Sequence, residues 1–142
     1  MYGDKGEVPE EEYTIPLGVA DVKRAGKDVT IVSFGKIIKE AFAAADALAK
    51  EGIECEIIDI RTIRPMDWET IFASVKKTNR LVILEEAWPF GCVSSEITYQ
   101  VQEHIFDYLD APIQRITTAD TPAPYSPALL QEWLPNAQDV IK

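Results

Sequence analysis

Val29-Thr30-Ile31-Val32-Ser33-Phe34 is followed by Gly35 and then by a stretch in which apolar residues recur every three or four positions. A mostly apolar, β-branched run of this length is typical of a strand buried on both faces of a sheet. The apolar positions that follow share one face of a helix that Gly52 closes; they are Ile37, Ala41, Ala44 and Leu48. These residues therefore predict a strand followed by a helix.

The same alternation continues along the chain. Further strands are expected at residues 53–60, 81–84 and 113–117, with a weaker edge strand at 18–23. Asp67 can cap a second helix, and a third helix carries an apolar stripe of Val93, Ile97, Val101 and Ile105. Strands that alternate with helices of this length predict an α/β fold, with a mostly parallel sheet covered on both faces.

Two short helices are expected near the end of the sequence. Ser126 is a capping residue followed by Pro127 at the first helical position, and Asn136 can cap a last helix that ends at Lys142. The proline-rich stretch between residues 119 and 127 reads as a loop.

The chain has 142 residues and a net charge of -10, which suits one soluble domain. Residues 1–14 are expected to form an acidic linker or tail, and residues 15–142 the domain. No apolar run is long enough for a membrane span, and no leader of basic and then apolar residues is visible. We therefore expect an intracellular protein. The acidic composition argues against nucleic-acid binding, and the two cysteines match no zinc spacing.

The charge is unevenly distributed. Residues 81–142 contain nine acidic and only two basic side chains, whereas residues 1–80 contain 15 acidic and 12 basic ones. Net charge mostly reflects solubility, so a solvated surface is one interpretation. The alternative is a surface that binds a basic partner by electrostatic attraction.

Signals for a self-sufficient active site are weak. Cys92 lies at the start of a helix, where a thiolate nucleophile is favoured, but His104 is 12 residues further along the same helix and therefore roughly 18 Å away. Cys92 is better explained as a small packing residue, although a cysteine-dependent enzyme remains an alternative. A second alternative is a regulatory domain that binds a small anion at the turn formed by residues 33–36, where Gly35 and Lys36 begin a helix.

Two charged segments follow predicted strands. Glu85 and Glu86 end the third apolar strand, and as neighbours on a strand they should point to opposite faces. Trp88 and Phe90 beside them could line a pocket or an interface, although packing is the commoner role. Residues 59–67 contain two arginines, two aspartates and a proline, which suggests an internally salt-bridged corner.

Three ordered motifs carry a resemblance to a known family. They are Asp59-x-Arg61-Thr62-Ile63-Arg64-Pro65-x-Asp67, then Glu85-Glu86-x-Trp88-x-x-Gly91 with Glu96-Ile97, and then Asp120-Thr121-Pro122-Ala123-Pro124-Tyr125-Ser126. Together they resemble the C-terminal domain of the beta subunit of thiamine-diphosphate-dependent 2-oxoacid dehydrogenases, most closely the pyruvate dehydrogenases.

The resemblance implies a transketolase C-terminal-like, three-layer α/β/α fold, with a five-stranded sheet whose first strand is antiparallel. The family's pyrimidine-binding half, which holds the catalytic histidine, has no counterpart here, so the chain looks like an excised domain or a truncated subunit. It should bind neither thiamine diphosphate nor magnesium, which belong to the parent enzyme, and it should be inactive alone.

The resemblance also implies partners. These are the alpha subunit, a second beta subunit and the basic peripheral subunit-binding domain of the dihydrolipoyl acyltransferase, and a homodimer of the isolated domain is consistent with them. The family places an acidic docking residue at Asp110, and Glu85, Glu86 and Trp88 are further candidate contacts; turn formation alone is the alternative role of Asp110. The implied location is the cytoplasm, or the mitochondrial matrix in a eukaryote.

Overall fold

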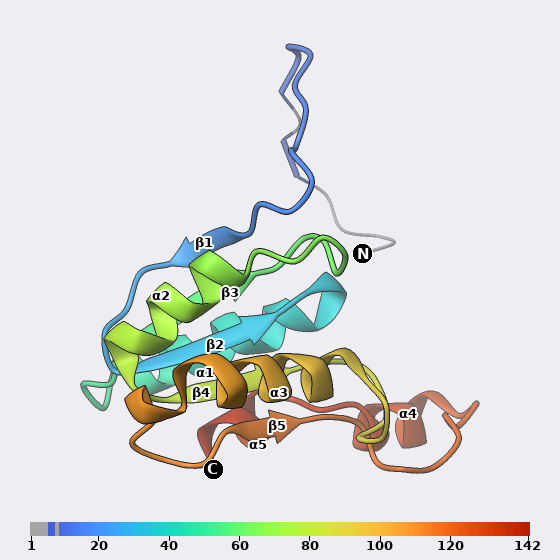
Figure 1. The fold of residues 1–142 in the computed structure, drawn as a ribbon. Helices are drawn as coiled ribbons and strands as arrows, with labels where there is room; N and C mark the ends of the chain where they lie inside the picture. Colours follow the sequence, from blue (N-terminus) through green and yellow to red (C-terminus); the bar gives the residue numbers. More distant parts are fainter. Residues whose placement is uncertain (1–5, 8) are drawn as a thin grey trace.

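A computed structural model describes residues 6, 7 and 9–142. Five strands form one sheet in the order β1-β3-β2-β4-β5 (Figure 1). The strands are β1 (Asp21–Arg24), β2 (Val29–Ser33), β3 (Cys55–Asp59), β4 (Leu81–Leu84) and β5 (Gln114–Ile116). β1 pairs antiparallel with β3, and the other neighbouring strands pair parallel. The expected five-stranded sheet with one antiparallel edge strand is confirmed.

Helices cover both faces of this sheet. They are α1 (Ile38–Ala49), α2 (Trp68–Thr78), α3 (Val93–Ile105), α4 (Pro127–Trp133) and α5 (Ala137–Ile141), with short 3-10 turns at Gly35–Ile37 and Phe106–Tyr108. Neighbouring residues of one strand point to opposite sides: Ile31 packs against α1, whereas Val32 packs in a cluster with α2 and α3. The three-layer α/β/α architecture follows from this alternation.

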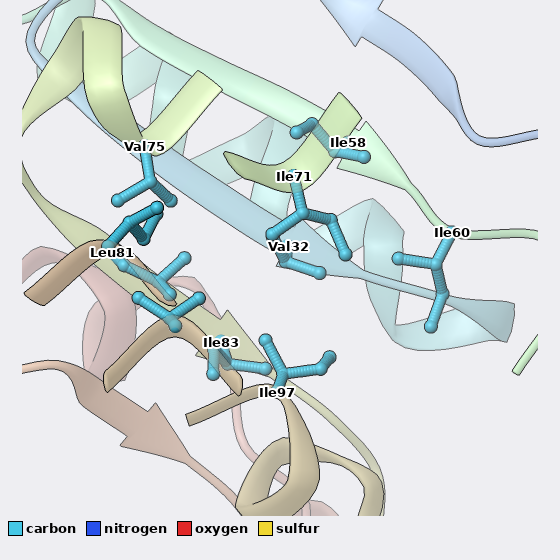
Figure 2. Packing of buried hydrophobic residues seen from close by; sticks show 10 residues of the cluster. Val32, Ile58, Ile60, Ile71, Val75, Leu81, Ile83 and Ile97 are labelled. Carbon is cyan, nitrogen blue, oxygen red and sulfur yellow. The ribbon is translucent and has the colours of Figure 1, made fainter. Parts of the chain in front are cut away.

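The larger apolar cluster lies between the sheet and the helices α2 and α3. Figure 2 shows Val32, Ile58, Ile83, Ile71 and Ile97 packed together from three strands and two helices. On the other face, α1 buries Ala41 and Ala45 and packs Ile38, Phe42 and Leu48 against the same cluster, and its neighbour α5 adds Val140. Each fully buried aliphatic side chain contributes about 1.5–3 kcal/mol relative to an exposed one.

Several element boundaries differ from those expected. The edge strand begins at Asp21 rather than residue 18, because the backbone N–H groups of Gly18 and Ala20 donate to the side chains of Thr62 (2.9 Å) and Asp67 (2.9 Å). Ser126 precedes Pro127 at the start of α4, but its side chain makes no capping hydrogen bond. Asn136 does cap α5, within a reciprocal capping box with Asp139.

The corner at residues 59–67 is organised differently from the expected internal salt bridges. Arg61 pairs with Asp21 of β1, Asp59 accepts the backbone N–H of Arg61, and Asp67 caps α2. Within the described part of the chain, no ion pair joins an arginine of this corner to one of its own aspartates. The corner is therefore held by hydrogen bonds and by its contact with β1.

Candidate docking surface

Asp110 lies on the loop that enters β5, beside the end of α2. Its backbone N–H donates to the carbonyl oxygen of Asn79 at 2.9 Å, and the side-chain amide of Asn79 donates to the carbonyl oxygen of Tyr108 at 2.7 Å. Asn79 ends α2 in the left-handed conformation, which asparagine adopts more readily than most residues. These bonds fix the start of the loop against the end of α2.

The Asp110 carboxylate faces solvent. Its side chain is 62% exposed. Arg80 Nη2 lies 4.0 Å from Asp110 Oδ2, and the Arg80 side chain is 55% exposed. A solvated ion pair at this separation contributes at most about 1 kcal/mol. The carboxylate can therefore exchange this contact for a cation of a partner at low cost.

An apolar hollow adjoins this carboxylate. A cavity of about 350 Å³ is lined by Gln102, Phe106, Leu109, Asp110, Ala111 and Pro112. Phe106 is 60% exposed, and the Lys76 ammonium lies 5.1 Å from the centre of the Tyr108 ring. Phe106 and Tyr108 were not predicted as site residues. Two aromatic residues on either side of Asp107, just before Asp110, are the pattern that could have indicated an apolar surface here. We define residues 102–112 as the docking surface.

More negative charge lies in the last turn of α3 and in the 3-10 turn that follows it. Glu103 and Asp107 are both exposed. A hydrogen bond with Glu103, reinforced by its charge, raises the pKa of the exposed Tyr99 hydroxyl. The docking surface thus combines an apolar hollow with three carboxylates, an arrangement that suits a basic partner with an apolar side chain of its own.

Glu85, Glu86 and Trp88 lie at the opposite end of the sheet, because they follow β4 whereas Asp110 precedes the parallel strand β5. Glu86 is exposed, and the Trp88 indole N–H donates to the carbonyl oxygen of Thr121 at 3.0 Å. Glu85 is only 1% exposed and contacts Ser94 of α3, whereas Glu86 borders a cavity shared with Glu40 of α1. The structure therefore does not bring the four candidate residues together, and Glu85 cannot reach a partner through this surface.

Glu85 belongs instead to a buried polar cluster at the start of α3. Its Oε1 accepts the backbone N–H of Ser94 at 3.0 Å, and among the described residues its Oε2 has no hydrogen-bond partner. Ser94 Oγ accepts from Arg115 Nε at 2.8 Å and lies 3.0 Å from Cys92 Sγ. This cluster fixes α3 to β4 and β5.

Cys92 contacts several polar groups at the start of α3. Its sulfur lies 3.1 Å from Arg115 Nη2, because β5 places that side chain under the first turn of α3. His104 packs on Phe72 with ring centroids 5.5 Å apart, and its Nδ1 contacts the carbonyl oxygen of Gln100. The imidazole is therefore held at the far end of α3, away from the thiol.

The turn at Gly35 and Lys36 borders a cavity of about 300 Å³. Its charged lining groups are two lysines, Lys36 and Lys39, and two carboxylates, Glu40 and Glu86. Because the carboxylates balance the lysines, this cavity does not favour an anion. Across the described residues, no group of three or more His, Cys, Asp or Glu side chains could hold a metal ion.

Residues 18–140 match the family model described as the transketolase C-terminal domain. The chain belongs to the transketolase C-terminal domain family. A split-gene transketolase solved as an inactive beta4 tetramer is 29% identical with a TM-score of 0.81, over 96% of this chain and 44% of that one. Family membership confirms the fold expected from the three sequence motifs.

Beta subunits of dehydrogenases are similar to this transketolase C-terminal domain over nearly its whole length. The acetoin:2,6-dichlorophenolindophenol oxidoreductase subunit beta of Bacillus subtilis is 48% identical over 99% of this chain and 41% of its own length. The mitochondrial pyruvate dehydrogenase E1 component subunit beta of Dictyostelium discoideum is 50% identical, over 93% of this chain and 37% of its own length. The expected resemblance to such beta subunits is confirmed, and the chain spans about two fifths of these relatives.

In the described part of this family member, no helix is both long and apolar enough to cross a lipid bilayer.

Proposed function

We propose that this chain serves as the assembly and docking domain of the beta subunit of a thiamine-diphosphate-dependent 2-oxoacid dehydrogenase. The parent enzyme would decarboxylate a 2-oxoacid oxidatively and transfer the acyl group to lipoyl groups. The cofactor and the catalytic residues lie elsewhere in that enzyme. The identity with dehydrogenase beta subunits supports this proposal.

The partners proposed for this domain are the alpha subunit, a second beta subunit and the basic peripheral subunit-binding domain of the dihydrolipoyl acyltransferase. The related split-gene transketolase, a beta4 tetramer, supports contact between beta chains. The proposed location is the cytoplasm, or the mitochondrial matrix in a eukaryote. Mitochondrial and bacterial proteins both occur among the relatives.

One observation carries the docking role: the exposed Asp110 carboxylate borders an apolar hollow on the acidic half of the chain. A lysine or arginine of the acyltransferase's subunit-binding domain would pair with Asp110, while an apolar neighbour fills the hollow. Partial desolvation of such a pair strengthens it relative to an exposed one.

Titration calorimetry with that isolated subunit-binding domain tests the role. Asp110→Asn should weaken binding at least about 30-fold, because the partner's cation loses its charged partner in a partly desolvated contact. Asp120→Asn is the matched control, since it removes the same charge from the exposed loop after β5, at the other end of the sheet. An equal loss in both variants, or an unchanged affinity in Asp110→Asn, would refute the assignment.

A further inference from the structure

Cys92 lies directly before α3, at the end of the sheet opposite the docking surface. Its thiol is partly exposed, whereas the second cysteine of the chain, Cys55, is fully buried. A small reagent in solution can therefore reach Cys92 but not Cys55. The proposed function makes no use of this thiol.

Hydrogen-bond donors surround the Cys92 sulfur. Arg115 Nη2 lies 3.1 Å from it, and the hydroxyl oxygens of Ser94 and Ser95 lie 3.0 and 3.4 Å away. Ser94 Oγ accepts from Arg115 Nε at 2.8 Å, so the Ser94 hydroxyl hydrogen is free to point to the sulfur. The carbonyl oxygen of Pro89, 3.7 Å from the sulfur, already accepts from Arg115. These contacts favour the charged thiolate over the neutral thiol.

The backbone adds to this effect. Cys92 is the N-cap of α3, a helix of 13 residues, and its side chain makes no capping hydrogen bond. The positive end of the helix dipole therefore lies beside the sulfur. The thiolate is the nucleophilic form of cysteine, and only a small fraction of free cysteine is ionised at neutral pH. The site thus combines access from solution with a sulfur that is activated as a nucleophile.

A buried carboxylate in the same cluster lacks a hydrogen-bond donor. Glu85 is 1% exposed, and its Oε1 accepts the N–H of Ser94, the residue whose hydroxyl contacts the Cys92 sulfur. Among the described residues, Glu85 Oε2 has no partner. A buried carboxylate oxygen without a donor costs free energy. A thiolate cannot supply that donor, but a sulfenic acid carries a hydroxyl group that can.

We propose that Cys92 is a site of oxidation by hydrogen peroxide, at which its thiol becomes a sulfenic acid. The sulfur attacks one peroxide oxygen, so that an S–O bond forms and the O–O bond breaks. The sulfur gives two electrons to the peroxide, and the departing hydroxide combines with the proton released by the thiol to form water. Arg115 pairs with the thiolate before this step, and Glu85 provides an acceptor for the hydroxyl of the product.

Cys55 cannot convert this product into a disulfide within the chain. It begins β3, whereas Cys92 follows β4, and because β3, β2 and β4 are parallel the two cysteines lie at opposite ends of the sheet. The sulfenic acid is therefore open to a small thiol from solution, which condenses with it and releases water.

Dimedone, a reagent that traps sulfenic acids, tests the proposal by mass spectrometry of the 142-residue chain treated with hydrogen peroxide. The adduct should form on Cys92 and not on Cys55. At neutral pH, Cys92 should be oxidised at least about tenfold faster than free cysteine, because most of its thiol is ionised. No adduct on Cys92, or a rate no higher than that of free cysteine, overturns the proposal.

Arg115→Gln should slow the oxidation of Cys92 at least about fivefold, because the positive charge beside the sulfur is lost. Arg24→Gln is the matched control, since it removes an arginine from β1, at the opposite edge of the sheet from β5, and should leave the rate unchanged. Circular dichroism establishes that the variants fold, and the comparison with free cysteine needs only the wild-type chain. Equal slowing in the two variants contradicts the role of Arg115.

Glu85→Gln separates formation of the sulfenic acid from its persistence. Adding dimedone after increasing delays measures the lifetime of the product, which should fall at least about threefold because an amide accepts a hydrogen bond less strongly than a carboxylate. The rate of formation should not fall. An unchanged lifetime overturns the assignment of Glu85 to this site.

Discussion

Glu56 is a buried carboxylate between the sheet and α2. Its Oε2 is paired with the Lys77 ammonium and accepts the backbone N–H of Gly26 at 3.3 Å. Burial raises the pKa of Glu56, but hydrogen bonds from Lys77, Ser74 and Gly26 outweigh it, and the net effect lowers the pKa below its ordinary value of 4.5. The ionised form therefore stabilises the fold.

We expect Glu56→Gln to lower the free energy of unfolding at neutral pH by about 1–2 kcal/mol, because a charge-assisted bond becomes a neutral one while Lys77 stays half exposed. A group with a depressed folded pKa stabilises fully above its unfolded pKa and loses that effect as pH falls through the folded pKa. The difference between Glu56→Gln and wild type should thus shrink below about pH 4.5.

Urea unfolding at neutral and acidic pH measures this difference. Glu54→Gln provides the control, because Glu54 forms an exposed pair with Lys27 at 3.2 Å and should contribute less than about 0.5 kcal/mol. A difference for Glu56→Gln that does not vary with pH would show that the charge of Glu56 contributes nothing.

At the scale of elements, Asp67 joins α2 to the chain entering β1. Its carboxylate accepts the Thr70 N–H at 3.0 Å, the Thr70 hydroxyl at 2.8 Å and the Ala20 N–H at 2.9 Å. Burial raises the pKa of Asp67, but these bonds outweigh it and lower the pKa. One side chain therefore ends the loop, starts the helix and holds the edge of the sheet.

Asp67→Ala should lower the free energy of unfolding by about 1–2 kcal/mol through loss of the cap. It should also speed hydrogen exchange at the Ala20 amide. Ser126→Ala is the comparison variant, because Ser126 occupies the same position before α4 without a side-chain cap, and it should be nearly neutral. Unchanged exchange at Ala20 would show that Asp67 does not hold the edge strand.

The elements differ in how well their sequence predicts them. β4 matches its expected residues 81–84, because an apolar run bounded by Arg80 and Glu85 has clear ends. The sequence could not indicate that Gly18 and Ala20 bond to side chains more than 40 residues away, which shortens β1. Alternation along a strand predicts that Glu85 and Glu86 face opposite sides of the sheet. Which of the two glutamates is buried depends on how α3 packs against the sheet, and the sequence does not indicate this.

At the scale of the molecule, the charge asymmetry and the motif resemblance predict a domain that binds a basic partner. The structure divides the candidate residues between two ends of the sheet, because Glu86 and Trp88 follow β4 whereas Asp110 precedes β5, which runs parallel to β4. Pairing between strands is a long-range property, so local patterns alone could not predict which candidates lie together.

The most direct test of the docking account is amide chemical-shift mapping on the isotope-labelled chain while the basic subunit-binding domain is added. The account predicts shifts concentrated on the docking surface, from Gln102 to Pro112, together with Asn79 and Arg80. Shifts concentrated instead around Glu86 and Trp88, with residues near Asp110 unaffected, would contradict it.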